Sequence, residues 1–240
     1  MRLPGNGVNA NLNATAATAN DSPCLFQILP YLEQDAYFRN VVTNTVIKTY
    51  LEPSRGRSGT VLSGATPTGP FPATDYAVNI GALYGITLPA NATALRTGTL
   101  GMFSYPDGTS NTVLAGVKRM NPAQYNIDAN DRPIVDRNAA GHTDLPGTAS
   151  SLFALARGWS IYNTNTCTAG RDVGYTGESR VDQFGNPYPA GVLFCFVDGS
   201  VRSIAYTVLT GDRPAGSGDN VQNFLEAILT PNGGEVVSLE

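Results

Sequence analysis

The sequence predicts an α+β fold, because it combines a strong β-hairpin signal with two segments of helical periodicity. The hairpin lies at residues 192–204, where an apolar run is followed by Asp198-Gly199 and a second strand that begins at Val201. Asp-Gly favours a tight type I′ hairpin turn, whose central residues both adopt positive φ. We expect this hairpin to form the centre of the sheet.

Helical spacing of apolar residues recurs twice. Residues 23–41 begin with Ser22-Pro23, a typical N-cap followed by proline at the first helical position. Pro30 should kink or split this helix, because proline lacks the backbone N–H that the helix needs. A second amphipathic helix is expected at residues 220–229.

Further strands are expected where β-branched and apolar residues cluster, at residues 46–51, 75–81, 112–117 and 158–163. Asp107-Gly108 precedes the third of these strands and is interpreted as a second hairpin turn. Residues 1–22 are small and polar, which indicates a flexible lead-in. Residues 23–240 are expected to form a single domain, with long loops at residues 53–75 and 120–150.

The composition favours an extracellular protein over a cytosolic enzyme. Only 14% of the residues are charged, and 26 glycines and 16 prolines indicate a loop-rich chain. The net charge is −4 and the basic residues are scattered, so nothing points to a nucleic-acid partner. The chain shows no transmembrane run, and the residues after Met1 resemble the middle of a protein, so we expect an upstream segment.

The three cysteines form no C-x-x-C pair, which argues against a zinc or iron–sulfur site. Cys195 lies within the apolar strand and is expected to be a buried free thiol. Cys24 and Cys167 could form a disulfide in an oxidising compartment.

No catalytic pattern is evident, and we expect that the protein is not an enzyme. The only histidine, His142, lies in a polar loop, and no Gly-x-Ser-x-Gly motif is present. A hydrolase with scattered carboxylates stays open as an alternative. No cofactor is expected, although Asp128, Asn130 and Asp131 offer oxygen ligands of the kind calcium takes, against the alternative of a solvated turn. Asp107 and Asp198 are interpreted as structural turn residues, together with Gly108 and Gly199.

Several short motifs occur in an order that resembles a known family. They are Leu29-Pro30-Tyr31-Leu32-Glu33-Gln34, Ile47-Lys48-Thr49-Tyr50-Leu51-Glu52-Pro53-Ser54, Thr74-Asp75-Tyr76, Asp107-Gly108-Thr109-Ser110-Asn111-Thr112, Phe196-Val197-Asp198-Gly199-Ser200-Val201-Arg202 and Gly233-Gly234-Glu235-Val236-Val237. This order is similar to that of the large planctomycete family of type IV pilin-like, or pseudopilin-like, proteins of unknown function, and it extends over residues 24–238.

The resemblance has three departures. The histidine of the family's processing-associated motif, nine residues before Asp-Gly, falls on Tyr188. The cysteine usual before Pro-Ser falls on Glu52, and an acidic residue usual after the Ser-Asn-Thr strand falls near Val117. The chain is therefore interpreted as a divergent member that lacks the family's hydrophobic N-terminal helix.

What the resemblance implies is a pilin-like head, with an N-terminal helix packed on an antiparallel β-sheet and long loop insertions. It further implies an exported structural subunit of a type IV pilus or type II secretion-like surface assembly. Such a subunit would associate with itself or with other pilin-like subunits, and would reach the membrane only through the missing helix. The alternative is a secreted soluble module that binds glycan or calcium through loops near Trp159, Tyr162, Tyr175 and Tyr188.

Overall fold

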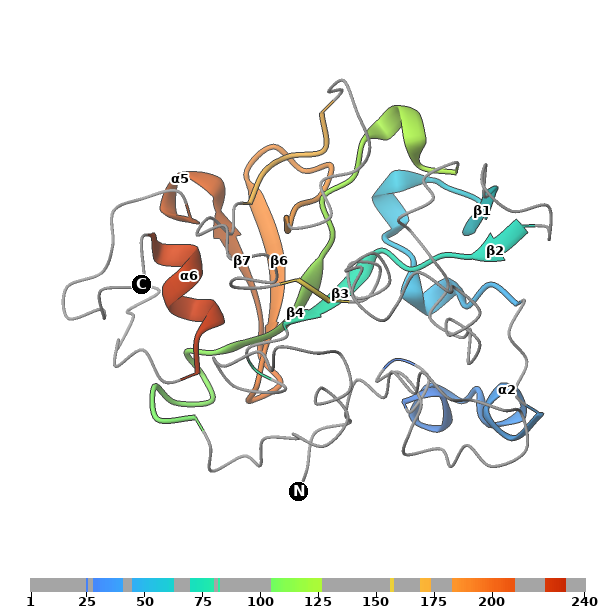
Figure 1. Cartoon of the computed structure of the whole chain (residues 1–240), viewed down its shortest axis with the longest axis horizontal. Coiled ribbons are helices and arrows are strands. Elements are labelled where there is room, and N and C mark those ends of the chain that lie inside the picture. The colour runs from blue at the N-terminus through green and yellow to red at the C-terminus, as the bar shows by residue number, and fades with distance from the viewer. Residues whose placement is uncertain are drawn as a thin grey trace, which may run out of the picture.

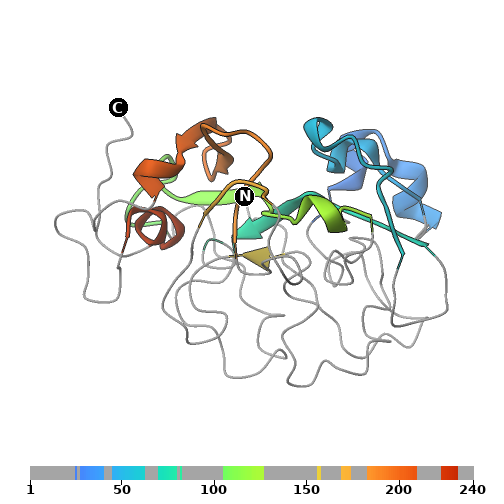
Figure 2. The same cartoon turned by 90° about the horizontal axis from the view of Figure 1, so that it is seen from above.

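The structure is a computed structural model of the whole chain. It describes residues 25, 28–40, 45–62, 70–79, 82, 105–126, 156–157, 169–173, 183–209 and 223–231. Within these residues a twisted sheet lies in the middle, with the C-terminal helices at one end and the N-terminal helical segment at the other (Figures 1 and 2). The fold is thus a mixture of helices and a mainly antiparallel sheet, as the sequence predicts at this coarse level.

The main sheet has five strands in the order β5-β3-β4-β6-β7. Four of them are antiparallel neighbours, and the two-residue strand β5 pairs with β3 in parallel. The strands are β3 (Tyr76–Asn79), β4 (Val113–Val117), β5 (Ala156–Arg157), β6 (Gly191–Phe196) and β7 (Val201–Ala205). The expectation that the β6–β7 hairpin forms the centre is wrong, because β4 occupies that position and β7 lies at an edge of the described sheet.

The turn between β6 and β7 differs from the type I′ turn that the Asp-Gly pair suggests. The N–H of Gly199 donates to Phe196 O at 3.0 Å, and the N–H of Phe196 donates to Ser200 O at 2.9 Å. Gly199 has φ of +86°, whereas Asp198 does not have positive φ. The connection is therefore a type I turn followed by a left-handed glycine bulge.

One hydrophobic core lies between the sheet and the C-terminal helix α6 (Phe224–Leu229). Leu225, Ile228 and Leu229 of this helix are completely buried. The side chain of Asn223 caps the helix by accepting a hydrogen bond from Glu226 N at 2.9 Å. On the sheet side, Phe184 and Phe194 pack edge to face with ring centroids 5.2 Å apart.

Strand β6 is covered less evenly than its apolar sequence suggests. Val192, Phe194 and Phe196 are completely buried, whereas Leu193 and Cys195 on the other face are only half-buried. This alternation is typical of an antiparallel strand with one well-covered face.

The N-terminal helical segment is split, but the described break lies at Glu33, and Pro30 occupies the first turn of the helix before it. A 3-10 helix, η2 (Leu29–Leu32), ends at Glu33 in the left-handed conformation with φ of 60°, and α2 (Asp35–Asn40) follows. Leu29 is completely buried. Packing of the whole 23–41 segment on the sheet stays a prediction, since part of it lies outside the described residues.

The strand expected at residues 46–51 is wrong. This segment forms a 3-10 helix, η3 (Lys48–Tyr50), and a second one, η4 (Pro53–Arg55), follows immediately. The bend buries the Tyr50 ring, which is 4% exposed, and brings Glu52 N within 2.6 Å of the Asp75 carboxylate. Burial of one aromatic ring and one charged contact thus overrides the β-propensity of the segment.

Other elements complete the described structure. They are the two-stranded pair β1 (Thr60–Leu62) and β2 (Pro70–Pro72), the 3-10 helix η6 (Pro122–Gln124) and the short helix α5 (Tyr206–Leu209). Residues 1–22 and the expected strand at 158–163 lie outside the described residues, so the lead-in and the single-domain organisation stay predictions.

Replacement of Gly185 by alanine should destabilise the fold strongly. A Cβ at this position would lie 1.9 Å from the carbonyl oxygen of Gly170, and this backbone is held because Gly170 N donates to Phe184 O at 3.0 Å. We expect a loss of about 3 kcal/mol in the free energy of unfolding, measured with urea. Gly199→Ala is the control, since its Cβ would meet nothing within 4 Å and only its φ of +86° opposes it. It should lose about 1 kcal/mol, and equal losses for the two variants would contradict this account.

Candidate functional site

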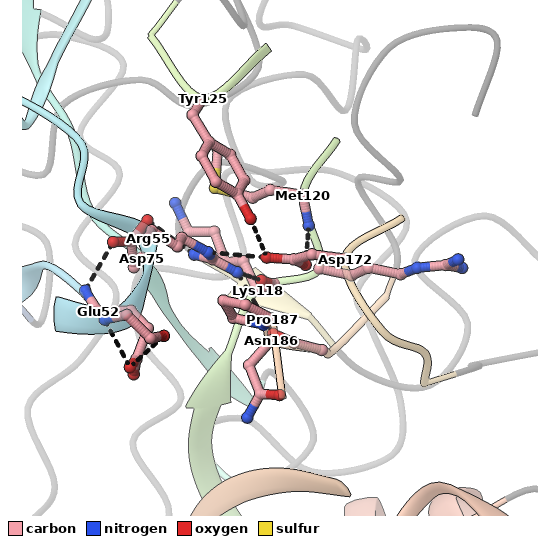
Figure 3. A network of polar contacts seen from close by, with 12 residues as sticks. Glu52, Arg55, Asp75, Lys118, Met120, Tyr125, Asp172, Asn186 and Pro187 are labelled. Atoms are coloured by element: carbon pink, nitrogen blue, oxygen red, sulfur yellow. Dashed lines mark hydrogen bonds and ion pairs between the residues drawn. The ribbon is translucent and has the colours of Figure 1, made fainter. Parts of the chain in front are cut away.

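A buried ionic cluster around Arg55 is the most concentrated group of polar side chains in the described structure (Figure 3). Arg55 ends η4, Asp75 directly precedes β3, and Asp172 lies in the segment 169–173. The side chains of all three are completely buried. The sequence brings these residues together only through the fold, since Arg55 and Asp172 are 117 positions apart.

The guanidinium of Arg55 makes several hydrogen bonds at once. Its Nη1 donates to Asp75 Oδ1 at 2.7 Å, and its Nε donates to Asp172 Oδ2 at 2.9 Å. Its Nη2 donates to the carbonyl oxygen of Lys118, directly after β4. The Arg55 guanidinium also lies over the ring of Tyr125, 5.6 Å from the ring centroid.

The carboxylates of Asp75 and Asp172 also interact with groups other than Arg55. Asp75 accepts a hydrogen bond from Glu52 N through Oδ2 and forms an ion pair with Arg57, whose Nε lies 3.2 Å from Oδ1. Asp172 accepts from Met120 N at 2.8 Å through Oδ1 and from the hydroxyl of Tyr125 at 2.9 Å through Oδ2. Every carboxylate oxygen of the pair therefore has a donor, which is the condition under which buried charges are tolerated.

The electrostatics of the cluster shift two pKa values. Burial by itself would lower the pKa of Arg55, but the carboxylates of Asp75 and Asp172 outweigh it, so the net shift is upward. Burial, followed by the charge of Asp172, raises the pKa of the Tyr125 hydroxyl above its ordinary value. Both groups are thereby held in the protonated form that donates to the carboxylates.

The arrangement is suited to holding segments together. It joins the η4 turn, the start of β3, the chain after β4 and the 169–173 segment. Its carboxylate oxygens are already bonded inside the protein, and the three central side chains have no exposure to solvent. A catalytic acid or base must instead reach a substrate proton.

A pocket of about 420 Å³ opens beside this cluster. All its lining residues come from the segment 46–58, and Glu52 is the acidic one among them. Glu52 is only 4% exposed. Its Oε1 accepts hydrogen bonds from Ser54 Oγ at 2.9 Å and from the hydroxyl of Tyr188 at 3.3 Å. Tyr188, which is 43% exposed, thus contacts Glu52 from a position 136 residues away.

The contact between Glu52 and Tyr188 links two positions that depart from the family pattern. In the sequence, these two residues stand apart as replacements of a cysteine and a histidine. The structure brings them together, whereas Val117, the third departure, is buried in the core at the end of β4. The negative charge of Glu52, after burial, contributes to raising the pKa of the neighbouring Tyr76.

The turn residues identified from the sequence lie away from the cluster. Asp198 is exposed, and its Oδ1 accepts a hydrogen bond from Ser200 N at 2.8 Å, which lowers the pKa of its carboxyl. Asp107 is buried, and its carbonyl oxygen accepts from Asn111 Nδ2 at 2.8 Å. Gly108 adopts φ of +93° and donates its N–H to Tyr105 O. Whether this second turn joins two strands depends on residues 101–104, which lie outside the described residues.

The remaining candidate residues are not described by the structure. The calcium candidates Asp128, Asn130 and Asp131, the cysteines Cys24 and Cys167, and His142 all fall in this group. The described residues contain no cluster of three or more acidic, cysteine or histidine side chains suited to a metal ion. Cys195 is a free, half-buried thiol, and burial followed by the charge of Asp198 raises its pKa.

Comparison with known proteins establishes a family without a function. Residues 39–209 match a family model described as "Protein of unknown function (DUF1559)". The chain belongs to this family. The match to the DUF1559 model includes the main sheet and the Arg55 cluster, and it ends at the last residue of α5, before α6. No curated protein and no solved structure matches the chain.

Among the helices of the described residues, none is long and apolar enough to cross a membrane.

Replacement of Arg55 by methionine should cost about 3–5 kcal/mol in the free energy of unfolding, because two buried carboxylates lose their shared cation. Arg39→Met is the matched control. Arg39 forms an i,i+4 ion pair with Asp35 on α2, with side chains 76% and 50% exposed. Its loss should stay within about 0.5 kcal/mol. Urea unfolding of both variants measures the difference, and similar losses would show that the cluster does not stabilise the fold.

Replacement of Tyr125 by phenylalanine should change the alkaline limit of stability. Because the folded-state pKa of Tyr125 is raised, its contribution is complete below about pH 10, the ordinary tyrosine pKa. Above that pH the unfolded chain loses the proton first, so stability falls as pH rises towards the folded-state pKa. Tyr125→Phe should therefore reduce the slope of unfolding free energy against pH above pH 10. Tyr31→Phe, which removes a hydroxyl from an 85% exposed side chain, is the control, and an unchanged slope in Tyr125→Phe would contradict the assignment.

Proposed function

We propose that this DUF1559 protein is an exported structural subunit, pilin-like or pseudopilin-like, of a type IV pilus or type II secretion-like surface assembly. The proposal includes an extracellular or cell-surface location and the absence of enzymatic activity. Its partners are further copies of the chain or other pilin-like subunits.

The internally satisfied Arg55 cluster carries this proposal. A surface subunit with few charged residues and long loops needs its loops held in a fixed position on the sheet. The cluster supplies that rigidity, because it ties four irregular segments together with buried, charge-assisted hydrogen bonds. The order of short motifs that the chain shares with pilin-like proteins adds support.

The second candidate is a secreted soluble module that binds a ligand. The observation that favours it is the open pocket that Glu52 helps to line. Glycan or calcium was the expected ligand class from the sequence, and the calcium candidates lie outside the described residues.

The assembly proposal is tested on the native protein from its source cells. We expect the coding sequence upstream of residue 1 to encode an apolar helix of about 20 residues, since that length spans a bilayer and can form a filament core. The intact mass of the mature protein should include this helix, and antibody labelling in the electron microscope should mark surface assemblies. A mature protein that begins at Met1 and stays monomeric at high concentration would contradict the proposal.

A further inference from the structure

Strand β7 forms one edge of the main sheet, next to β6 (Figure 1). The hydrogen bonds at the two ends of this hairpin show which way its backbone groups point. Phe196 N donates to Ser200 O at 2.9 Å, and Tyr206 N donates to Ala190 O at 3.4 Å. The register between these two bonds is unbroken. Because backbone groups alternate between the two sides of an antiparallel strand, every second residue of β7 directs its N–H and C=O away from the sheet. These outward residues are Val201, Ser203 and Ala205.

The outward backbone groups of β7 are open to a partner. No hydrogen bond among the described residues uses them. The side chains of Val201, Ser203 and Ala205 are exposed, and Val201 is 66% exposed. These side chains lie on the face of the sheet opposite the core, because the alternate residue Ile204 is buried in the core. The helix α5 that follows turns towards the core, where Leu209 is buried, so it leaves the edge accessible.

Strand β7 also lacks the features that usually protect a sheet edge. Proteins protect such edges with very short strands, prolines, bulges or outward charges. The other edge of this sheet, β5, has only two residues, and β2 begins and ends with proline. Strand β7 has five residues, no proline and no bulge. Its one charged residue, Arg202, places its guanidinium over the ring of Phe196, 4.6 Å from the ring centroid. The edge is therefore suited to pairing with another strand.

We propose that β7 pairs with β7 of a second copy of the chain, in antiparallel orientation about a two-fold axis at Ser203. In this register Ser203 lies opposite Ser203 of the second copy, and Val201 lies opposite Ala205. Every outward N–H and C=O of the two strands then has a partner in the other copy. The larger side chain of Val201 faces the small one of Ala205, and no charged residue lies opposite another.

The strand itself selects this register and this partner. A register two residues closer to the turn would put Arg202 opposite Arg202 of the second copy, and like charges directly opposite destabilise a strand pair. A register two residues the other way would require pairing by Thr207, which lies in α5. A shift of one residue would set outward groups against groups that already bond to β6. The edge is thus complementary to itself in one arrangement, as a two-fold interface requires.

Pairing through β7 alone should be weak and should depend on concentration. A strand of five residues buries much less surface than the roughly 1,200 Å² of a stable interface. A weak contact becomes effective when subunits are already held close together, as they would be in a surface assembly. The inference does not depend on that assembly, because β7 can pair in this chain without an upstream helix. Dimers of a protein that has no such helix would support the pairing and contradict the proposed function.

Sedimentation equilibrium of the full chain tests the pairing. It is measured under reducing conditions, so that no cysteine can link two copies, and from about 10 μM to about 1 mM, where weak interfaces associate. We expect a reversible equilibrium between monomer and dimer. A monomer at every concentration would overturn the proposal. Growth beyond the dimer would also overturn it, because a two-fold pairing of edges closes at two copies.

Two charged variants test the position of the axis. Ser203→Lys and Ser203→Glu each place two like charges opposite one another, so each should weaken its own dimer at least about fivefold. An equimolar mixture of the two variants should regain at least the association of the parent, because a lysine then faces a glutamate. Ala36→Lys is the matched control, since it adds the same charge at an exposed position on α2, at the other end of the described structure (Figure 1). It should associate as the parent does. Unchanged association in either single variant, or no recovery in the mixture, would overturn the proposal.

Ser203→Pro tests the backbone contact without a change of charge. Proline removes an N–H that points away from β6, so the hairpin bonds remain and the circular dichroism spectrum should be unchanged. The dimer loses the two hydrogen bonds at its axis, and its association should weaken at least about tenfold. Undiminished association in a folded Ser203→Pro would contradict the pairing. If this variant fails to fold, the two charged variants and their mixture decide the question.

Discussion

The buried contact of Arg55 with Asp75 and Asp172 is the constraint on which the described structure depends. The guanidinium lies where its own η4 turn meets the start of β3, the chain after β4 and the 169–173 segment, and it donates to all three of these other segments. Buried ion pairs add little net stability over an apolar core. An arrangement in which one partner is missing is nevertheless strongly destabilised, because a buried charge is left unpaired. In a chain with so few charged residues, this penalty selects a single placement for loops whose own sequences specify almost no regular structure.

Sequence patterns within single segments predicted the strands and the helix whose formation depends mainly on their own residues. The apolar and β-branched runs at 75–81, 112–117 and 192–204 became β3, β4 and the β6–β7 hairpin, and the 220–229 periodicity became α6. The strand expected at 46–51 was wrong because burial of Tyr50 and the contact of Glu52 N with Asp75 bend the chain into 3-10 turns. The place of the hairpin in the sheet was also wrong, since strand order is decided by pairings between distant segments and leaves no trace in either strand.

The candidate site could not be predicted from the sequence, because it too is formed by residues that lie far apart along the chain. Arg55 and Arg57 lie in a stretch of Gly, Pro and Ser that indicates only a loop, and their partner Asp172 lies far along the chain. A signal was nevertheless present, because two arginines within three residues are conspicuous in a chain that is 14% charged. Glu52 and Tyr188 were identified only as isolated departures from a family pattern. Their hydrogen bond shows that the two replacements form one local unit, with an acid and a phenol in contact.

The carboxylates in this region differ in how completely the fold uses their oxygens. Both carboxylate oxygens of Asp75 and of Asp172 accept hydrogen bonds from within the protein. Neither carboxylate therefore has an oxygen left for a ligand. Glu52 donates its backbone N–H to Asp75, and its Oε1 accepts from Ser54 Oγ and the hydroxyl of Tyr188, which fixes its position at the edge of the network. The cluster that makes the loops rigid therefore also fixes the position of Glu52, the acidic residue among those that line the pocket.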